Sequence, residues 1–301
     1  MIISPNRAKL FDANISKVFD QEFNQYDEYK QFVQNLTSKQ QFEEVAMFSE
    51  VPLPSKVGEL EDFPMVEAVA GPKRRWVHEK YGFELIASKE AIDDELFPVI
   101  VNTGKAAATA MRHRLEIQGV YDYDMAFTAN SVGPSDTASE TLCSTSHATF
   151  VGAGGATQAN RPDTDITLGV DSLWAAIDNF AGLTDREGQP IVKIPRKLMT
   201  NAVNKRVCKE ILDSMNMPYS MNREDNVLKS EGITPVYSHY LISSTAWFLM
   251  TDTPPVWFYT RQPVTIEAES RASNQSRAWI LSMRISHGPR TWEDVYGSTG
   301  A

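Results

Sequence analysis

Cys143 and His147 are the residues whose types and spacing most readily suggest chemistry, because a cysteine and a histidine four positions apart could share a metal ion on a helix. A structural zinc site needs four ligands and a catalytic one about three. No second pair of ligands is visible, since Cys208 belongs to another segment and the other histidines are scattered at positions 78, 113, 239 and 287. The pattern therefore predicts a small buried side chain at Cys143 and no metal site.

Two further motifs in the same region fall short of a catalytic or phosphate site. The glycines within residues 152–155 faintly resemble a phosphate-binding loop, but the lysine of a P-loop does not follow them. Ser144 and Ser146 lie beside His147 without the glycine-flanked elbow that exposes a nucleophilic serine. Both nucleophilic catalysis and phosphate binding are disfavoured.

The carboxylates Asp93, Asp94 and Glu95 could act as acid and base only if the fold held two of them across a substrate. They follow Ser88, whose hydroxyl can accept hydrogen bonds from the free amides of a first helical turn. Acids near the start of a helix complement its dipole. We therefore expect these carboxylates to stabilise a helix that begins after Ser88.

Basic side chains form two groups in a chain that is acidic overall. The 39 acidic residues outnumber the 29 basic ones, and the net charge of -10 disfavours specific DNA reading and binding to acidic lipid. The two groups are Lys73, Arg74, Arg75 and Lys80, and Lys193, Arg196, Lys197, Lys205, Arg206 and Lys209. Either group could meet phosphate, but for the first we favour contact with acids of another subunit.

The remaining composition bounds the class of protein. With 301 residues, of which 42% are hydrophobic, the chain can form one large core or two smaller ones. Its two cysteines fit a reducing compartment, and no apolar stretch predicts secretion or a membrane span. We expect synthesis in the cytoplasm and no membrane partner.

Apolar residues at helical spacing predict a helix over residues 9–43 with one hydrophobic stripe. The stripe comprises Phe11, Ile15, Phe19, Phe23, Tyr26, Tyr29, Val33 and Leu36. Residues 45–72 carry four prolines and two glycines, which predict an extended, irregular arm. Since one compact subunit should not satisfy both features, we expect them to bury surface on neighbouring copies. Folding of the leading segment over its own subunit would contradict this argument.

The rest of the chain predicts an α+β fold. Alternation predicts a strand over 75–86, and a period near four predicts a long helix over 99–121, the spine helix, followed by a loop over 128–165. Helices are expected over 172–180 and 202–215, with a turn at 185–188 and a strand at 191–194 between them. Further strands are predicted over 236–241, 246–250, 256–259, 264–268 and 277–286.

Taken in order, these segments resemble the major capsid protein of tailed bacteriophages, closest to the Mu-like major head subunit family. The resemblance rests on the helical start, the proline-rich arm, and a series of short motifs along most of the chain. These motifs are YGFELIA at 81–87, EAIDDE at 90–95, LCSTSH at 142–147, LWAAID at 173–178, GQPIVKIP at 188–195 and AWFL at 246–249.

The resemblance implies the fold of such proteins, with an N-terminal arm (1–44), an extended loop (45–87), a peripheral domain with the spine helix (88–166 and 256–301) and an axial domain (167–255). It implies hexamers and pentamers that close an icosahedral phage head around double-stranded DNA, without enzymatic activity or a cofactor. Expected partners are a separate scaffolding protein, a portal protein, possible decoration proteins and non-specifically packaged DNA. The expected location is the virion, after assembly in the host cytoplasm.

We expect the subunit interface to include residues from the helical stripe, three residues of the first basic group and the tryptophan that follows them. They are Phe11, Phe19, Phe23, Tyr26, Lys73, Arg74, Arg75 and Trp76. Two alternatives stay open. One is an encapsulin-type nanocompartment shell of the same fold, and the other is a soluble cytosolic enzyme that uses Cys143 or the carboxylates near Asp93.

Overall fold

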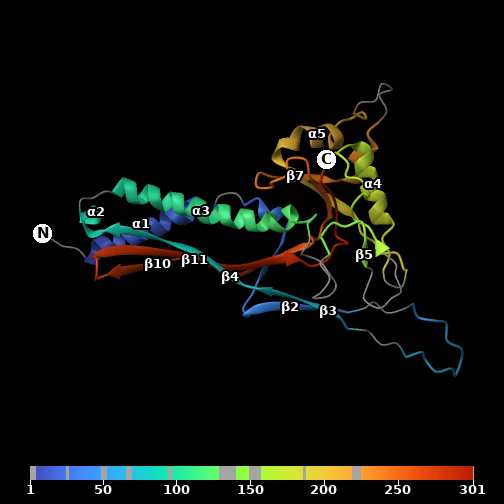
Figure 1. Cartoon of the computed structure of the whole chain (residues 1–301), viewed down its shortest axis with the longest axis horizontal. Helices are drawn as coiled ribbons and strands as arrows, with labels where there is room; N and C mark the ends of the chain where they lie inside the picture. The colour runs from blue at the N-terminus through green and yellow to red at the C-terminus, as the bar shows by residue number, and fades with distance from the viewer. Residues whose placement is uncertain are drawn as a thin grey trace.

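A computed structural model describes residues 5–24, 27–48, 53–65, 70–93, 97–128, 140–148, 157–185, 188–218 and 225–300. It has an elongated half, in which two helices lie along a long sheet, and a second body that contains another sheet and two shorter helices (Figure 1). A two-stranded ribbon lies beside the junction and leads into an extended loop. The mixed helix and sheet content agrees with the predicted α+β class.

The first sheet is built on a long hairpin. Its strands, in spatial order, are β1 (Gln34–Thr37), β10 (Val256–Arg271), β11 (Ser276–Pro289) and β4 (Glu79–Ser88). The chain was expected to interrupt this region at Pro263, but β10 runs through that proline. The register of β10 on β11 shifts between Gln262 and Thr265, and such an irregularity accommodates a residue that has no N–H to donate.

The spine helix is confirmed as α3 (Phe97–Asp124), which extends the prediction by a few residues at each end. Before it, α2 (Lys89–Asp93) begins after Ser88, whose Oγ accepts a hydrogen bond from the Ala91 N–H at 3.2 Å. This confirms the predicted cap. Asp94 and Glu95 and the side chain of Asp93 lie outside the described residues.

The predicted helix over 9–43 is wrong beyond Phe23. The structure has α1 (Pro5–Phe23), a short 3-10 helix η1 (Tyr29–Gln31), then β1 and β2 (Phe42–Phe48). Phe32 and Val33 are buried in the main core, and β1 pairs in parallel with β10. A short run of apolar residues fits either a helix or a strand. Here the pairing of β1 with the distant strand β10 makes these residues a strand.

The predicted strand over 75–86 is two strands, β3 (Ala70–Val77) and β4, which meet at His78 and belong to different sheets. β3 pairs with β2, whereas β4 pairs with β11. The buried His78 ring lies between the hydroxyls of Ser38, at 3.0 Å, and Ser286, at 2.9 Å. These contacts fix the point at which the chain changes sheets.

The second sheet consists of β12 (Val295–Ser298), β9 (Trp247–Thr251), β7 (Pro195–Asn201) and β8 (Thr234–Ser238), in that order. Helices α4 (Val170–Ala181) and α5 (Lys205–Leu212) flank it, with the 3-10 helices η2 (Ala202–Asn204) and η3 (Val227–Glu231) beside them. A small pair, β5 (His147–Ala148) and β6 (Thr157–Gln158), lies in the preceding segment.

Predictions for this body were partly right. The helix over 172–180 and the strand over 246–250 are confirmed as α4 and β9, and Gly188 donates to the Asp185 carbonyl at 3.1 Å in the predicted turn. The strand over 191–194 is wrong, because Val192 and Ile194 are exposed and the strand begins at Pro195. The helix over 202–215 is shorter, since a 3-10 turn precedes α5, which ends at Leu212.

Strand β9 joins the two hydrophobic cores. Phe248 and Met250 pack in the large core under α3, whereas Trp247 and Leu249 pack in the core of α4 and α5. Successive side chains of a strand point to opposite faces, so a strand buried on both faces reads as a continuous apolar run. This explains the sequence WFLM and fixes the second body on the first.

Candidate subunit interface

The most exposed apolar surface lies in residues 53–65, between β2 and β3. Leu53, Leu60, Phe63 and Met65 are all exposed, Phe63 at 82% and Met65 at 95%. The segment forms neither helix nor strand and projects beyond the β2 and β3 ribbon (Figure 1). Several large apolar side chains exposed in one short segment are typical of a site of protein interaction.

The stripe on α1 is not such a surface, and this expectation is wrong for the side chains that the structure describes. Ile15 and Phe19 are each only 3% exposed, and Phe23 stacks on Phe19 with ring centroids 5.4 Å apart. Asp12 forms an ion pair with Arg277 and accepts a hydrogen bond from the Trp279 indole N–H at 3.0 Å, which ties α1 to β11. The side chain of Phe11 and the whole of Tyr26 lie outside the described residues.

The leading segment therefore covers its own subunit. Its described side chains find partners within the subunit, so the expectation that this stripe buries surface on neighbouring copies is wrong for them.

The four predicted residues of β3 divide between the two faces of the strand. Arg74 donates to the carbonyls of Pro289 and Arg290 at 2.6 and 2.8 Å, and burial lowers its pKa to about 10. Trp76 packs on Trp257 and Tyr259, with ring centroids 6.0 and 5.8 Å away. These two side chains contact their own subunit. Alternate residues of a strand face opposite ways, which leaves Lys73 and Arg75 exposed.

Lys73 and Arg75 differ in what they contact. Lys73 forms an ion pair with Glu44 at 3.2 Å. The Arg75 guanidinium lies over the ring of Phe42, 3.5 Å from its centroid.

A groove of about 510 Å³ opens where β3, β4, α3 and β11 meet. Its lining is aromatic and charged, and comprises Arg75, Trp76, Val77, Glu79, Tyr81, Arg114, Gln118, Tyr121, Ile285, Ser286 and His287. The Arg114 guanidinium lies over the Tyr81 ring at 4.4 Å, and the Tyr121 ring meets the His287 ring edge-on at 5.6 Å. Arg114 and Tyr121 were not predicted, although positions 114, 118 and 121 recur at the spacing of one helical face.

Cys143 and His147 occupy a buried structural cluster. His147 is fully buried and stacks on Trp292 with ring centroids 4.4 Å apart, while its Nε2 donates to Asn160 Oδ1 at 2.9 Å. Burial raises the pKa of the Cys143 thiol and lowers that of His147. The shift of Cys143 disfavours the thiolate, which is the nucleophilic form of a cysteine. Among the described residues, no three His, Cys, Asp or Glu side chains could hold a metal ion.

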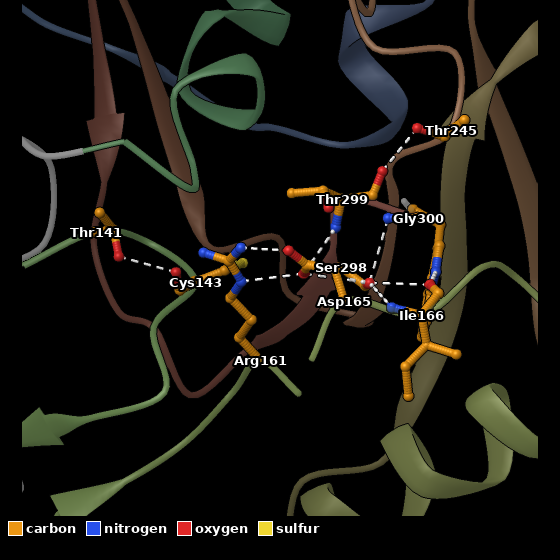
Figure 2. Close-up of polar contacts among 10 residues, drawn as sticks. Thr141, Cys143, Arg161, Asp165, Ile166, Thr245, Ser298, Thr299 and Gly300 are labelled. Carbon is orange, nitrogen blue, oxygen red and sulfur yellow. Dashed lines mark hydrogen bonds and ion pairs between the residues drawn. The ribbon is translucent and has the colours of Figure 1, made fainter. Parts of the chain in front are cut away.

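The end of the chain is fastened to residues 161–166 by a polar network (Figure 2). Asp165 forms an ion pair with Arg161 and accepts a hydrogen bond from the Thr299 N–H at 3.2 Å. Ser298 Oγ accepts from the Ile166 N–H at 2.9 Å and donates to the Ile166 carbonyl at 3.0 Å. The bonds with Arg161 lower the pKa of Asp165, so the carboxylate form holds this end in place.

The second basic group is largely engaged within the subunit. Lys193 forms an ion pair with Asp294 at 2.8 Å, Arg196 donates to the Glu231 carbonyl at 2.9 Å, and Lys197 donates to the Gln31 carbonyl at 3.1 Å. No described helix is long and apolar enough to cross a bilayer.

Comparison with solved structures finds this fold in a phage chain, in a virus-like particle and in the capsid of a GTA particle. A chain from Microbacterium phage Oxtober96 matches with a TM-score of 0.57 at 12% identity, over 91% of this chain and 91% of that one. A chain of a virus-like particle from Pyrococcus furiosus gives 0.54 at 12% identity, over 95% and 98%. A chain from the capsid of an empty GTA particle gives 0.50 at 8% identity, over 89% and 88%.

The sequence itself matches no known family model and no curated protein. The structural likeness nevertheless covers about nine-tenths of this chain or more in each case. The chain therefore shares its fold with a chain from a Microbacterium phage, a chain of a virus-like particle and a chain from the capsid of a GTA particle.

Proposed function

We propose that this chain is the major capsid protein of a tailed bacteriophage, closest to the Mu-like major head subunits. Its copies form hexamers and pentamers that close into an icosahedral head around double-stranded DNA. The observation that carries the proposal is the match in fold to a phage chain over 91% of both chains, because a likeness of this extent covers most of the subunit and not one domain alone. The role is structural, with no enzymatic step and no cofactor.

The exposed loop supports assembly on physical grounds. Leu60, Phe63 and Met65 would remain in water in a monomer, and burying such side chains stabilises an interface by about 25 cal/mol per Å². In the proposed shell this loop lies on a neighbouring subunit.

The proposed domains correspond to the two bodies of the structure. The elongated half with α3 and the first sheet is the peripheral domain, and the body with α4 and α5 is the axial domain. Two strands refine the boundaries drawn from the sequence: β4 pairs with β11 in the first sheet, and β12 pairs with β9 in the second. The proposed partners are a scaffolding protein, a portal protein, possible decoration proteins and packaged DNA, in a virion assembled in the host cytoplasm.

The test is expression of the full chain with and without a candidate scaffolding protein, followed by size-exclusion chromatography and negative-stain microscopy. We expect closed particles of megadalton mass. A chain that stays a 33.7 kDa monomer or a dimer at every concentration and ionic strength contradicts the proposal and favours a soluble protein of another class.

A second candidate is an encapsulin-type nanocompartment, which the match to the Pyrococcus furiosus virus-like particle favours. The two shells differ in content. Particles purified from their natural source should contain double-stranded DNA if the chain is a phage capsid protein, and a cargo protein if it is a nanocompartment shell. Nuclease-resistant DNA and mass spectrometry of the contents separate the two.

A further inference from the structure

Lys80, Gln262 and Arg284 form a row across the first sheet that has no role in the proposed function. Arg284 of β11 is paired directly with Lys80 of β4 on one side and with Gln262 of β10 on the other. Paired residues of this kind share one face of a sheet, and neighbouring strands lie about 4.8 Å apart. The row therefore places two cations and one amide within about 10 Å of each other on one surface.

This row lies on the face of the sheet that is turned away from the large core. Met283 and Ile285, which flank Arg284 in β11, are both buried in that core with residues of α3. Successive side chains of a strand point to opposite faces, so Arg284 points the other way. Figure 1 shows α1 and α3 lying together along this sheet. Lys80 is exposed and Arg284 is half-buried, so a solute can reach the row.

Arg261 adds a third cation beside the row. The register of β10 on β11 shifts between Thr260 and Gln262, and a bulge of this kind redirects the side chain that it contains. Burial lowers the pKa of His78, and the charges of Arg284 and Arg261 lower it further, so both guanidinium groups lie near that ring. The Nε atom of Arg261 is buried and has no hydrogen-bond partner among the described residues.

The three cations have no acid to balance them. Within the ranges that the structure describes, none of them has a carboxylate at ion-pair distance. The acids of the surrounding strands contact other groups: Glu43 with Ser38, Glu79 with Tyr81 and Glu84 with Arg271. Like charges directly opposite each other on neighbouring strands are destabilising. An anion between these side chains would remove that repulsion.

We propose that Lys80, Arg261 and Arg284 form a binding site for an oxyanion of the phosphate class. Arginine presents a planar set of donors that fits phosphate oxygens, and lysine adds a compact charge. The Gln262 amide donates one of its two N–H groups to Thr265 at 3.1 Å and offers the other. A single phosphate can contact two strands of the row, and a chain of two or three phosphates can span it.

The sequence alone could not assemble this site. Lys80 was grouped there with Lys73, Arg74 and Arg75, as residues that could meet phosphate or acids of another subunit. The structure separates them, because the chain changes sheets at His78 and only Lys80 belongs to β4. Its two arginine partners come from strands near the other end of the chain.

The phosphate can belong to a free polyphosphate or to the backbone of a nucleic acid, since both present the same oxygens. The net charge of -10 weakens the attraction of the whole chain for a long polyanion, whereas a short anion responds mainly to the local cations. The site lies within one subunit, so it does not depend on the proposed shell function.

Calorimetric titration of the full-length, unassembled chain with tripolyphosphate at fixed ionic strength tests the site. R261Q/R284Q should weaken binding by about hundredfold or more and K80Q by about tenfold, because each lost charge-assisted hydrogen bond costs roughly tenfold. The matched control K17Q/K56Q removes two exposed lysines elsewhere and changes the net charge equally. Its affinity should stay within about twofold of the unmodified chain.

Thermal melts of K80Q give a second readout. Without the anion, this substitution removes the repulsion between Lys80 and Arg284 and should raise Tm by about 1–2 °C. In excess tripolyphosphate the unmodified chain binds more tightly and should melt above K80Q. This reversal distinguishes a binding site from a lysine that only protects the edge of the sheet. Circular dichroism establishes that each variant is folded, and K80Q carries the test if R261Q/R284Q does not fold.

A short DNA duplex titrated in the same way identifies the source of the phosphate. Binding of the duplex that is lost in R261Q/R284Q assigns the site to nucleic acid, and such binding of tripolyphosphate alone assigns it to a free phosphate. Both results support the site. No saturable binding of either ligand, or equal affinities for R261Q/R284Q and K17Q/K56Q, overturns it and leaves the shell proposal to be decided by particle formation.

Discussion

The carboxylate of Glu116, in the middle of the spine helix, accepts hydrogen bonds from the backbone N–H of Tyr29 at 2.9 Å and from that of Glu28 at 2.8 Å. This side chain is only 2% exposed and accepts hydrogen bonds from the backbone at the start of η1. It therefore joins the N-terminal segment to the spine helix. Burial raises its pKa to about 7, and the nearby carboxylates of Glu28 and Asp27 contribute to the rise. The same bond that positions the segment therefore responds to pH.

Glu116→Gln should change the pH dependence of stability. The folded state binds this proton more tightly than the unfolded state does, so the free energy of unfolding of the unmodified subunit falls as pH rises from the usual glutamate pKa to about 7. The slope should be at most about 1.4 kcal/mol per pH unit. Urea titrations of the unassembled chain between pH 4.5 and 8 measure it.

In the glutamine variant this decline should be absent. The exposed Glu90→Gln is the control and should keep the slope of the unmodified chain. Parallel pH profiles for the Glu116→Gln and Glu90→Gln variants would contradict the role assigned to Glu116.

Two glycines of the spine helix should respond in opposite ways to the same substitution. A Cβ at Gly119 would lie 2.4 Å from the Cβ of Tyr29, whereas a Cβ at Gly104 would meet Ile15 Cγ2 at 3.7 Å, an ordinary contact. Gly104→Ala should stabilise the subunit by up to about 1 kcal/mol, because alanine is the better helix former. Gly119→Ala should destabilise it by roughly 1–3 kcal/mol through overpacking. Thermal melts of the two variants provide the comparison, and equal shifts would refute it.

The elements that could be predicted from the sequence are those whose signal is local. The spine helix has a long run at helical spacing, the Ser88 cap has a specific chemistry, and α4 has a clear apolar face. Strands β1, β2 and β12 were not predicted, because each depends on a distant partner. The sequence VYGS of β12 has little strand character, yet all four residues are buried against β9.

The exposed apolar surface was predicted less well than the fold, for a related reason. Exposure depends on tertiary packing, so the apolar spacing of Phe19 could not tell a buried face from a surface offered to a partner. The groove combines residues from α3, β3, β4 and β11, and only their packing brings them together. The loop 53–65 was predicted as extended because prolines and glycines act locally.

Asn160→Ala should be among the most destabilising polar substitutions in the subunit. Its side-chain amide donates to the carbonyls of Leu142, Trp292 and Val295 at 2.8 to 3.0 Å, while its Oδ1 accepts from the Ser144 N–H and from His147. Removing this buried amide leaves several polar groups without partners, which should cost roughly 3 kcal/mol or more. The control Asn35→Ala removes an exposed side chain with one long bond to Val33. Chemical denaturation should show a much smaller loss for the control, and similar losses would contradict the role of Asn160.

Asp165→Asn should weaken the attachment of the chain end in a pH-dependent way. The ion pair with Arg161 lowers the pKa of Asp165 in the folded state, so its contribution to stability is full above the usual aspartate pKa and is lost as pH falls through the lower, folded value. At neutral pH the substitution should cost about 1–2 kcal/mol. The exposed Asp163→Asn is the matched control and should cost little. Hydrogen exchange of the Thr299 and Gly300 amides measures the attachment directly. Exchange of both amides should be faster in D165N than in the unmodified chain at pH 7. This difference in exchange rate should narrow toward pH 3. Unchanged protection of both amides in D165N would show that the network in Figure 2 does not hold the chain end.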